Sequence, residues 1–227
     1  MASTSSTSSA AASPDAQDAA RSPRLASHAD RDTRRPRGSS PARDLARIAV
    51  MTALMAVLGM VPPIAVAGVP APIVLQNIVV ILAGLILGPW RGAASQLLFV
   101  GLVALGLPLL TGGRGGLGVF AGPSVGFILV WPIAAAVVGL IFWALTGRAR
   151  RGLSTGRIAV AATVAALIGG IGVVYAGGIV GFVLNAGMEV GAAVLSMGVF
   201  LPGDTIKAVV AVLLVVGLWK AYPRAFR

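Results

Sequence analysis

Two ionisable residues near the carboxyl end of the chain have the types and spacing to bind a polar ligand. Asp204 and Lys207 lie in the segment FLPGDTIK, and residues three positions apart project from the same side of a helix. Pro202 and Gly203 directly precede them, so we expect the chain to break there, with Asp204 as the N-cap of a last helix. The alternative is structural, a capping aspartate followed by a lysine that extends to solvent. We favour a binding site, because no other acid–base pair occurs in residues 48–227.

A glycine-rich segment, residues 111–124, is a second candidate and reads TGGRGGLGVFAGPS. Glycine permits positive φ and close approach of a ligand to the backbone, so the segment can form a cap with Arg114 as its cation. A flexible connector is the alternative. No strand is expected before it and no Lys-Ser/Thr pair follows, which excludes a dinucleotide fingerprint and a phosphate-binding loop. The glycines assigned to the candidate site are Gly112, Gly113, Gly115 and Gly116.

Two adjacent amides, Gln76 and Asn77, stand at the start of a short apolar run. A buried amide needs hydrogen-bond partners, which either another helix or a polar ligand can supply. We slightly favour the helix as partner and keep both residues as candidates for ligand binding.

The residue inventory argues against catalysis and against metal or cofactor chemistry. The chain has no Cys, and its one histidine, His28, lies in a polar N-terminal segment. The acids after residue 47 are Glu189 and Asp204 alone, so we expect no paired carboxylates and no metal cluster there. We predict that the protein is not an enzyme and has no catalytic residue, metal site or cofactor.

The elements that must position these residues are apolar helices. Hydrophobic residues make up 57% of the 227 and charged residues 11%, against about 25% in soluble domains. Continuous apolar runs near the length of about 20 residues that crosses a bilayer predict an all-α integral membrane protein with six transmembrane helices. We expect the longest run to tilt or break near its glycine clusters. The runs are Leu45–Val61, Ile73–Leu87, Ala93–Leu110, Ser124–Leu145, Ile158–Leu184 and Thr205–Ala221.

Composition divides the chain into three parts. Residues 1–44 are rich in Ser, Ala, Asp, Arg and Pro, so we expect a disordered cytoplasmic tail. Residues 45–222 form the membrane domain, and residues 223–227 a short cytoplasmic tail. With six spans, most Arg and Lys residues fall on one side of the membrane. The positive-inside rule makes that side cytoplasmic, so we expect a protein of the bacterial plasma membrane with both termini in the cytoplasm. The net charge of +11 does not indicate a nucleic-acid partner, because no basic face interleaved with aromatics is present.

Small residues recur along the first apolar run at three- and four-residue spacing: Ala46, Ala49, Ala53 and Ala56. Such a stripe lets two helices approach closely in lipid. Packing inside the bundle and docking of another membrane protein are equally good interpretations.

Several of these segments together resemble the BioY family, the biotin-specific S components of energy-coupling factor (ECF) transporters. The similarity lies in AGLILGPWRGAASQLLF (83–99), GLPLLTGGRGGLGVFAGPSVGF (106–127) and FLPGDTIKA (200–208), and it extends over Leu45 to Ala221. The glycine loop and the Pro-Gly-Asp-x-x-Lys element are specific in combination, although neither would be alone.

The resemblance implies a six-helix membrane protein that binds biotin from outside, beneath external loops. It also implies partners, namely a transmembrane coupling protein and two cytoplasmic ATPases. By position, Asp204 and Lys207 match the family's Asp-x-x-Lys, and Ala49 and Ala53 match its docking stripe. Phe127 stands where family members often carry Tyr, which puts the role of that position in question.

The function implied is biotin uptake, with this chain as a high-affinity substrate-capture subunit energised by ATPases on separate chains. Biotin presents a cyclic urea and a carboxylate. Asp204 can accept from the urea or orient Lys207, and Lys207 or Arg114 can pair with the carboxylate, while Gln76 or Asn77 complements the urea. One alternative is an S component for thiamine or riboflavin, which favour aromatic walls such as Trp131, Trp143, Phe127 and Phe182. A less favoured one is an intramembrane enzyme.

Overall fold

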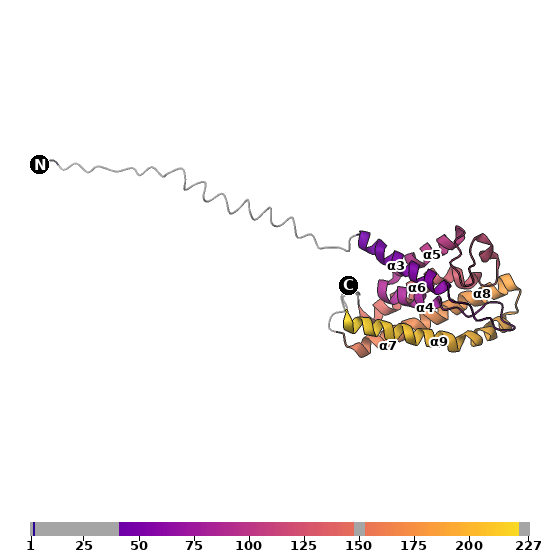
Figure 1. The fold of residues 1–227 in the computed structure, drawn as a ribbon. Coiled ribbons are helices and arrows are strands. Elements are labelled where there is room, and N and C mark those ends of the chain that lie inside the picture. The colour runs from indigo at the N-terminus through magenta and orange to yellow at the C-terminus, as the bar shows by residue number, and fades with distance from the viewer. Residues whose placement is uncertain (1, 3–40, 148–152, 223–227) are drawn as a thin grey trace. The chain divides into compact units, whose positions relative to one another are not determined.

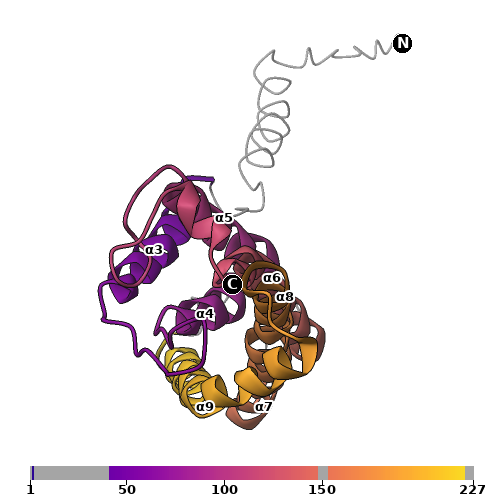
Figure 2. The same cartoon turned by 90° about the vertical axis from the view of Figure 1, so that its right-hand side faces the viewer.

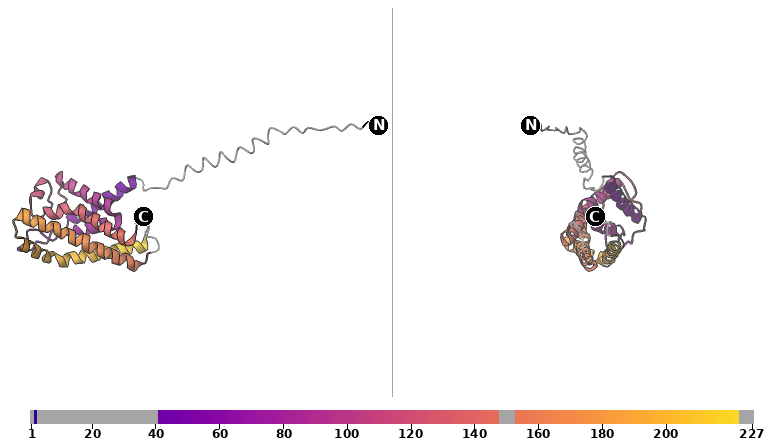
Figure 3. Two further views of the ribbon diagram at one scale, coloured as in Figure 1. Left: turned by 180° about the vertical axis from the view of Figure 1, so that it is seen from behind. Right: turned by 90° about the vertical axis from the view of Figure 1, so that its left-hand side faces the viewer.

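The computed structural model describes residue 2, residues 41–147 and residues 153–222. In these ranges the chain forms a bundle of six helices, which confirms the predicted fold class. The long helices run lengthwise along the bundle (Figures 1 and 3). Five of the six are α3 (Pro41–Gly59), α4 (Asn77–Leu87), α5 (Pro89–Ala104), α6 (Val125–Thr146) and α9 (Val190–Ala221). The other is continuous through α7 (Thr155–Ala165), a π-helical segment η2 (Ala166–Val173) and α8 (Val174–Ala186).

The described residues cover little of the two predicted tails. Residues 1, 3–40 and 223–227 lie outside the described residues, as do 148–152. Helix α3 begins at Pro41, four residues before the expected boundary at Leu45, with proline in the first turn where its missing N–H costs nothing. Asp44 in that turn forms an ion pair with Arg91 of α5, Nη2 to Oδ2 at 2.9 Å.

Three helices are long and apolar enough to cross a membrane by length and composition: α6, α7–η2–α8 and α9. Helix α4 is shorter, at 11 residues, and equally apolar. Nearly all of its residues are buried, because it lies among the other helices (Figure 2). A segment buried on every side must be apolar all round, and that is how the run reads in the sequence.

The predicted break before Asp204 is wrong. Helix α9 continues through Pro202 for 32 residues, and its N-cap is Glu189, whose carboxylate accepts from the backbone N–H groups of Gly191 and Ala192. Proline is tolerated within apolar membrane helices, where neighbouring helices and small adjustments satisfy the freed carbonyl. Asp204 therefore lies in the middle of a helix and not at its start.

The longest apolar run stays helical and widens at the expected place. Its π-helical segment η2 contains Gly169 and Gly170. A Cβ on Gly169 would collide with Val138 of α6, and one on Gly170 would collide with Ile81 of α4. These glycines let the widened segment press against its neighbours, so no break is needed.

Three further glycines bring α8 against α6. A Cβ on Gly126 would strike the backbone carbonyl of Gly177, and Cβ atoms on Gly177 and Gly181 would strike the backbone of Gly126. This close contact between backbones is the small-residue packing expected in lipid, where apolar side chains gain nothing by leaving the hydrocarbon. It places the start of α6 and the middle of α8 side by side.

Helix α3 lies at the edge of the bundle. Its polar links to α5 are the Asp44–Arg91 ion pair and a hydrogen bond from the Thr52 hydroxyl to the Ser95 carbonyl, at 2.9 Å. Ala49 and Ala53 are exposed. The alanine stripe therefore does not pack inside the described bundle at these two positions, which removes the internal-packing interpretation for them.

Candidate functional site

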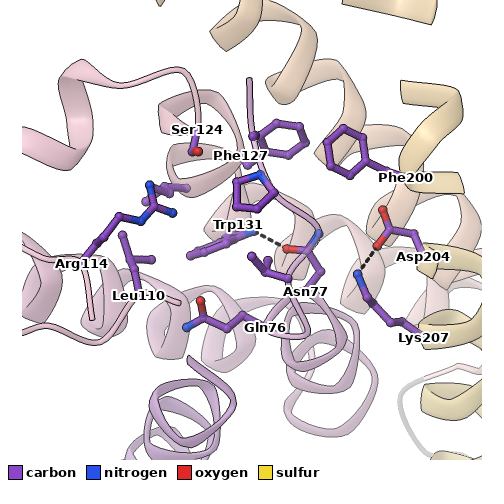
Figure 4. A pocket seen from close by; sticks show the side chains of 14 residues that line it. Gln76, Asn77, Leu110, Arg114, Ser124, Phe127, Trp131, Phe200, Asp204 and Lys207 are labelled. Atoms are coloured by element: carbon purple, nitrogen blue, oxygen red, sulfur yellow. Dashed lines mark hydrogen bonds and ion pairs between the residues drawn. The ribbon is translucent and has the colours of Figure 1, made fainter. Parts of the chain in front are cut away.

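A pocket opens where the loop before α4, the glycine loop, α6 and α9 meet (Figure 4). The loop before α4 is closed by a two-residue bridge in which Ile64 and Ile73 exchange backbone hydrogen bonds at 3.0 and 2.9 Å. The lining residues are Ala71, Pro72, Val74, Gln76, Asn77, Leu110, Arg114, Ser124, Phe127, Ile128, Trp131, Phe200, Asp204 and Lys207.

The acid–base pair of α9 forms one side of this pocket. Lys207 Nζ donates to Asp204 Oδ1 at 2.7 Å, and the residues are only 9% and 6% exposed. Tyr175 of α8 donates its phenolic O–H to the other carboxylate oxygen, Oδ2, at 3.0 Å. Isolated charges are costly in an apolar interior, and this pairing with a further hydrogen bond makes the burial tolerable. Asp204 and Lys207 lie on the same side of a helix, as predicted, although that helix is not broken before Asp204.

Asn77 and Trp131 form the base of the pocket. Trp131 Nε1 donates to Asn77 Oδ1 at 3.0 Å, and the indole is nearly fully buried beside Phe99, with ring centroids 6.0 Å apart. The bond orients the Asn77 amide so that its nitrogen remains without a hydrogen-bond partner among the described residues. Asn77 therefore offers two free N–H donors to a ligand.

Gln76 also lines the pocket, but its amide is fully used by the protein. Its nitrogen donates to the carbonyls of Met55 and Leu109 at 3.0 and 3.1 Å. Its oxygen accepts from the backbone N–H and the hydroxyl of Thr111 at 3.2 and 2.9 Å. With all four hydrogen-bonding positions occupied and 1% exposure, Gln76 joins α3, α4 and the glycine loop.

The glycine loop places Arg114 at the pocket, and none of its glycines lines the pocket. Gly112, Gly113 and Gly116 have φ of +82°, +69° and +80°, a region that strains other residues. The resulting turn is closed by a bond from the Leu110 N–H to the Arg114 carbonyl at 3.0 Å. Arg114 Nε donates to the Thr111 carbonyl at 3.3 Å.

The charged groups of the pocket are separated. In Figure 4 the Arg114 side chain faces the pocket from the side opposite to Asp204 and Lys207. Arg114 has no carboxylate partner in the part of the chain that the structure describes, whereas Lys207 has Asp204. The pocket therefore presents a free cation on one side and a nearly neutral ion pair on the other.

Aromatic rings form the remaining wall. Phe127 lies 5.6 Å from Phe182 and 5.8 Å from Phe200 between ring centroids, in edge-on and tilted arrangements. Its ring occupies the space that a side chain at position 178 would need, and Gly178 leaves that space open. Phe127 thus contributes apolar surface to the pocket.

Several residues of the site were not predicted from the sequence. Ser124 and Phe200 both line the pocket, and the hydroxyl of Ser124 makes no hydrogen bond to the described residues. Each lies in one of the motifs quoted above and could have been found there. The sequence suggested Trp131 only as part of an aromatic wall for thiamine or riboflavin. No pattern in the sequence pointed to Tyr175, because the direction of its side chain depends on the π-helical segment before it.

In chemical terms, the pocket can bind a small amphipathic molecule. It offers a cation, two amide N–H donors, a carboxylate acceptor within an ion pair, and apolar walls. Within residues 41–147 and 153–222, His, Asp and Glu form no group of three that would hold a metal ion.

Comparison with known proteins supports this interpretation of the fold. The BioY family model matches residues 28–224. A Rhizobium etli protein named biotin transporter BioY is 42% identical over 181 residues, which cover 80% of this chain and 95% of that protein. A protein of the same name from Rhodobacter capsulatus is 46% identical over 177 residues, 74% of this chain and 88% of that protein.

A solved structure shares the fold. The crystal structure of the S-component for biotin from an ECF-type ABC transporter has a TM-score of 0.73 and 32% sequence identity to this chain, and the match covers 82% of this chain and 96% of that one. Since the family model spans most of the chain and the relatives are matched over nearly their full length, this chain belongs to the BioY family.

Proposed function

We propose that this chain captures biotin for uptake into the cell, as the substrate-binding S component of an ECF-type transporter. It is a multi-pass membrane protein of the BioY family, and two relatives of that family are named biotin transporters. The observation that carries the proposal is a pocket with separated polar groups in a bundle that matches a biotin S-component at a TM-score of 0.73.

The groups of biotin match those of the pocket. Arg114 is the cation for the carboxylate, because Lys207 is already neutralised by Asp204. The urea carbonyl can accept from the free amide nitrogen of Asn77, and a urea N–H can donate to Asp204. The thioether ring and the alkyl chain fit the apolar wall of Phe127 and Phe200.

Gln76 and the four glycines have a supporting part in this proposal. Gln76 holds the loop through Thr111, and the glycines give the loop the turn that carries Arg114. Their effect on the ligand is indirect, since the amide of Gln76 is occupied and the glycines stand outside the pocket lining.

Movement of biotin across the membrane would be driven by other chains. The partners we propose are a transmembrane coupling protein and two cytoplasmic ATPases, because the sequence carries no nucleotide-binding motif of its own. Exposed Ala49 and Ala53 on α3 offer the surface on which a partner helix can dock closely.

The orientation in the plasma membrane that we propose has the pocket facing outward and both termini in the cytoplasm. The glycine loop and the turn between α8 and α9 lie at one end of the bundle. Arg91 at the start of α5, Arg157 at the start of α7 and Lys220 at the end of α9 lie at the other. The positive-inside rule assigns that second end to the cytoplasm.

Equilibrium binding to the purified full-length protein tests the proposal. Labelled biotin should bind saturably with one molecule per chain, and excess thiamine or riboflavin should not displace it. Biotin amide, which lacks the negative charge, should compete more weakly because Arg114 loses its partner. Binding of thiamine or riboflavin in place of biotin would assign the chain to another vitamin, and chemical conversion of the recovered biotin would indicate an enzyme.

A further inference from the structure

Tyr175 reaches the pocket region from a helix that contributes none of the lining residues. It lies on α8, whereas the lining residues come from α4, α6, α9 and the loops before α4 and α6. Its hydroxyl donates to Asp204 Oδ2 at 3.0 Å. The residue therefore touches the site through Asp204 and not through the pocket surface.

The hydrogen bond from Tyr175 completes the restraint of the Asp204 carboxylate. Oδ1 is held by Lys207, which lies on the same helix, at 2.7 Å. That bond alone would let carboxylate and ammonium turn together along the surface of α9. A second bond to Oδ2 from a different helix prevents this motion and leaves the remaining lone pairs of Asp204 with fixed directions.

The backbone around Tyr175 determines its direction. The π-helical segment η2 ends at Val173, two residues earlier. An extra residue in a turn rotates everything after it by about 100° relative to an uninterrupted α-helix. Buried Gly170 before Tyr175 and Gly177 after it press against α4 and α6, so the rotation of α8 is held on both sides.

From these contacts we infer that Tyr175 is a positioning residue for ligand recognition: it holds Asp204, and through it Lys207, in the geometry that binds the ligand. The inference rests on the proposed function of the pocket. Because Tyr175 acts through Asp204, its hydroxyl should matter only while the Asp204 carboxylate is present.

Tyr175→Phe removes the hydroxyl and keeps the ring, and isothermal titration of the full-length protein with biotin measures the effect. We expect affinity to fall by about tenfold or more, the usual effect of losing a hydrogen bond to a charged group. Tyr222→Phe is the matched control, the same change at an exposed residue near the end of α9, and should bind as the wild type does.

A double-mutant cycle separates positioning from general structure. In the Asp204→Ala background, which removes the acceptor of the Tyr175 hydroxyl, Tyr175→Phe should cause almost no further loss of affinity. Additive losses in the double mutant, or wild-type affinity in Tyr175→Phe, would overturn the inference about Tyr175. The proposed function would still stand, provided that the wild-type protein binds biotin. Wild-type protein that does not bind biotin would overturn the proposed function and this inference with it.

Discussion

At the scale of single residues, the polar groups of this bundle divide into those the protein has satisfied and those it leaves free. Gln76 makes four hydrogen bonds to three residues, whereas Asn77 keeps a free amide nitrogen and Arg114 has no carboxylate partner among the described residues. Asp204 and Lys207 neutralise each other but still face the pocket. Free donors and cations in an otherwise apolar cavity are the groups that a ligand must complement.

Removing one member of the ion pair should weaken biotin binding strongly. In Asp204→Asn and Lys207→Ala, the remaining charge is left unpaired in a buried site, which typically costs about 2–5 kcal/mol, or more than tenfold in affinity. Isothermal titration of each variant checks this result. Since Asp204 lies within α9, a capping role no longer offers a competing explanation.

Glu189→Gln is the control for that experiment. Glu189 is the other acid of this region, and it caps α9 away from the pocket. Glutamine keeps an oxygen that can accept these backbone hydrogen bonds, so stability should change by less than the about 0.5–2 kcal/mol of a lost cap, and affinity should stay unchanged. Equal affinity in Asp204→Asn and the wild type would remove the ion pair from the binding site and leave Arg114 and Asn77 as its polar groups.

At the scale of helices, glycine contacts decide which faces meet. The backbones of α6 and α8 touch at Gly126, Gly177 and Gly181, which brings Phe182 against Phe127 at the pocket wall. Helix α3 has no such contact with a neighbour through Ala49 and Ala53, which remain exposed. One set of small residues thus builds the bundle, while the other is available to a partner.

Gly126→Ala should destabilise the bundle and weaken biotin binding together. The added methyl would meet the carbonyl of Gly177, and relieving such overpacking typically costs about 1–3 kcal/mol. Thermal unfolding in detergent and biotin titration measure both effects. Gly198→Ala, a helical glycine of α9 with open space around it, should be neutral or stabilising in the same assays; destabilisation in both variants would show that the contact is not the cause.

Ala49→Trp or Ala53→Trp should reduce biotin uptake in cells while purified protein binds biotin nearly normally. A large ring on this exposed face would keep a partner helix at a distance without reaching the pocket. Val160→Trp, at another exposed apolar position on α7, is the control and should transport normally. Loss of binding together with retained association with a coupling protein would contradict the docking role.

At the scale of the whole molecule, a group of basic residues lies at the end of the bundle away from the glycine loop. Arg91, Arg157 and Lys220 mark the end where α5 and α7 begin and α9 finishes. The glycine loop lies at the other end, and the pocket extends from it to Asp204 in the middle of α9. This polarity fits the proposed orientation, in which the ligand enters from one side of the membrane and the partners lie on the other.

Reporter fusions test the orientation directly. Fusions at residues 114 and 188 should report an external location, and fusions at 152 and 227 a cytoplasmic one. A last helix that started after residue 203 would have placed position 195 in an external loop. In the structure position 195 lies inside α9, so residue 188, in the turn before α9, is the better fusion site. A fusion at 227 that reports outside would reverse the proposed topology and the outward opening of the pocket.

The sequence by itself determined the helical membrane fold and most of the polar residues of the pocket. Apolar runs such as Ser124–Leu145 predicted α6 to within a residue at each end, because long hydrophobic runs have one low-energy state in lipid, a helix. Arg114, Asn77, Asp204 and Lys207 stood out because polar residues are rare in such runs. Both inferences need only local information.

Only the tertiary structure decided how these residues are used. The amide of Gln76 is occupied by partners from α3 and the glycine loop, 21 to 35 positions away in sequence. Tyr175 meets Asp204 because a π-helical segment rotates α8, and α9 continues through Pro202 where local propensity predicted a break. Side-chain roles depend on helix rotation and on contacts between distant segments, and the propensities of neighbouring residues do not specify either.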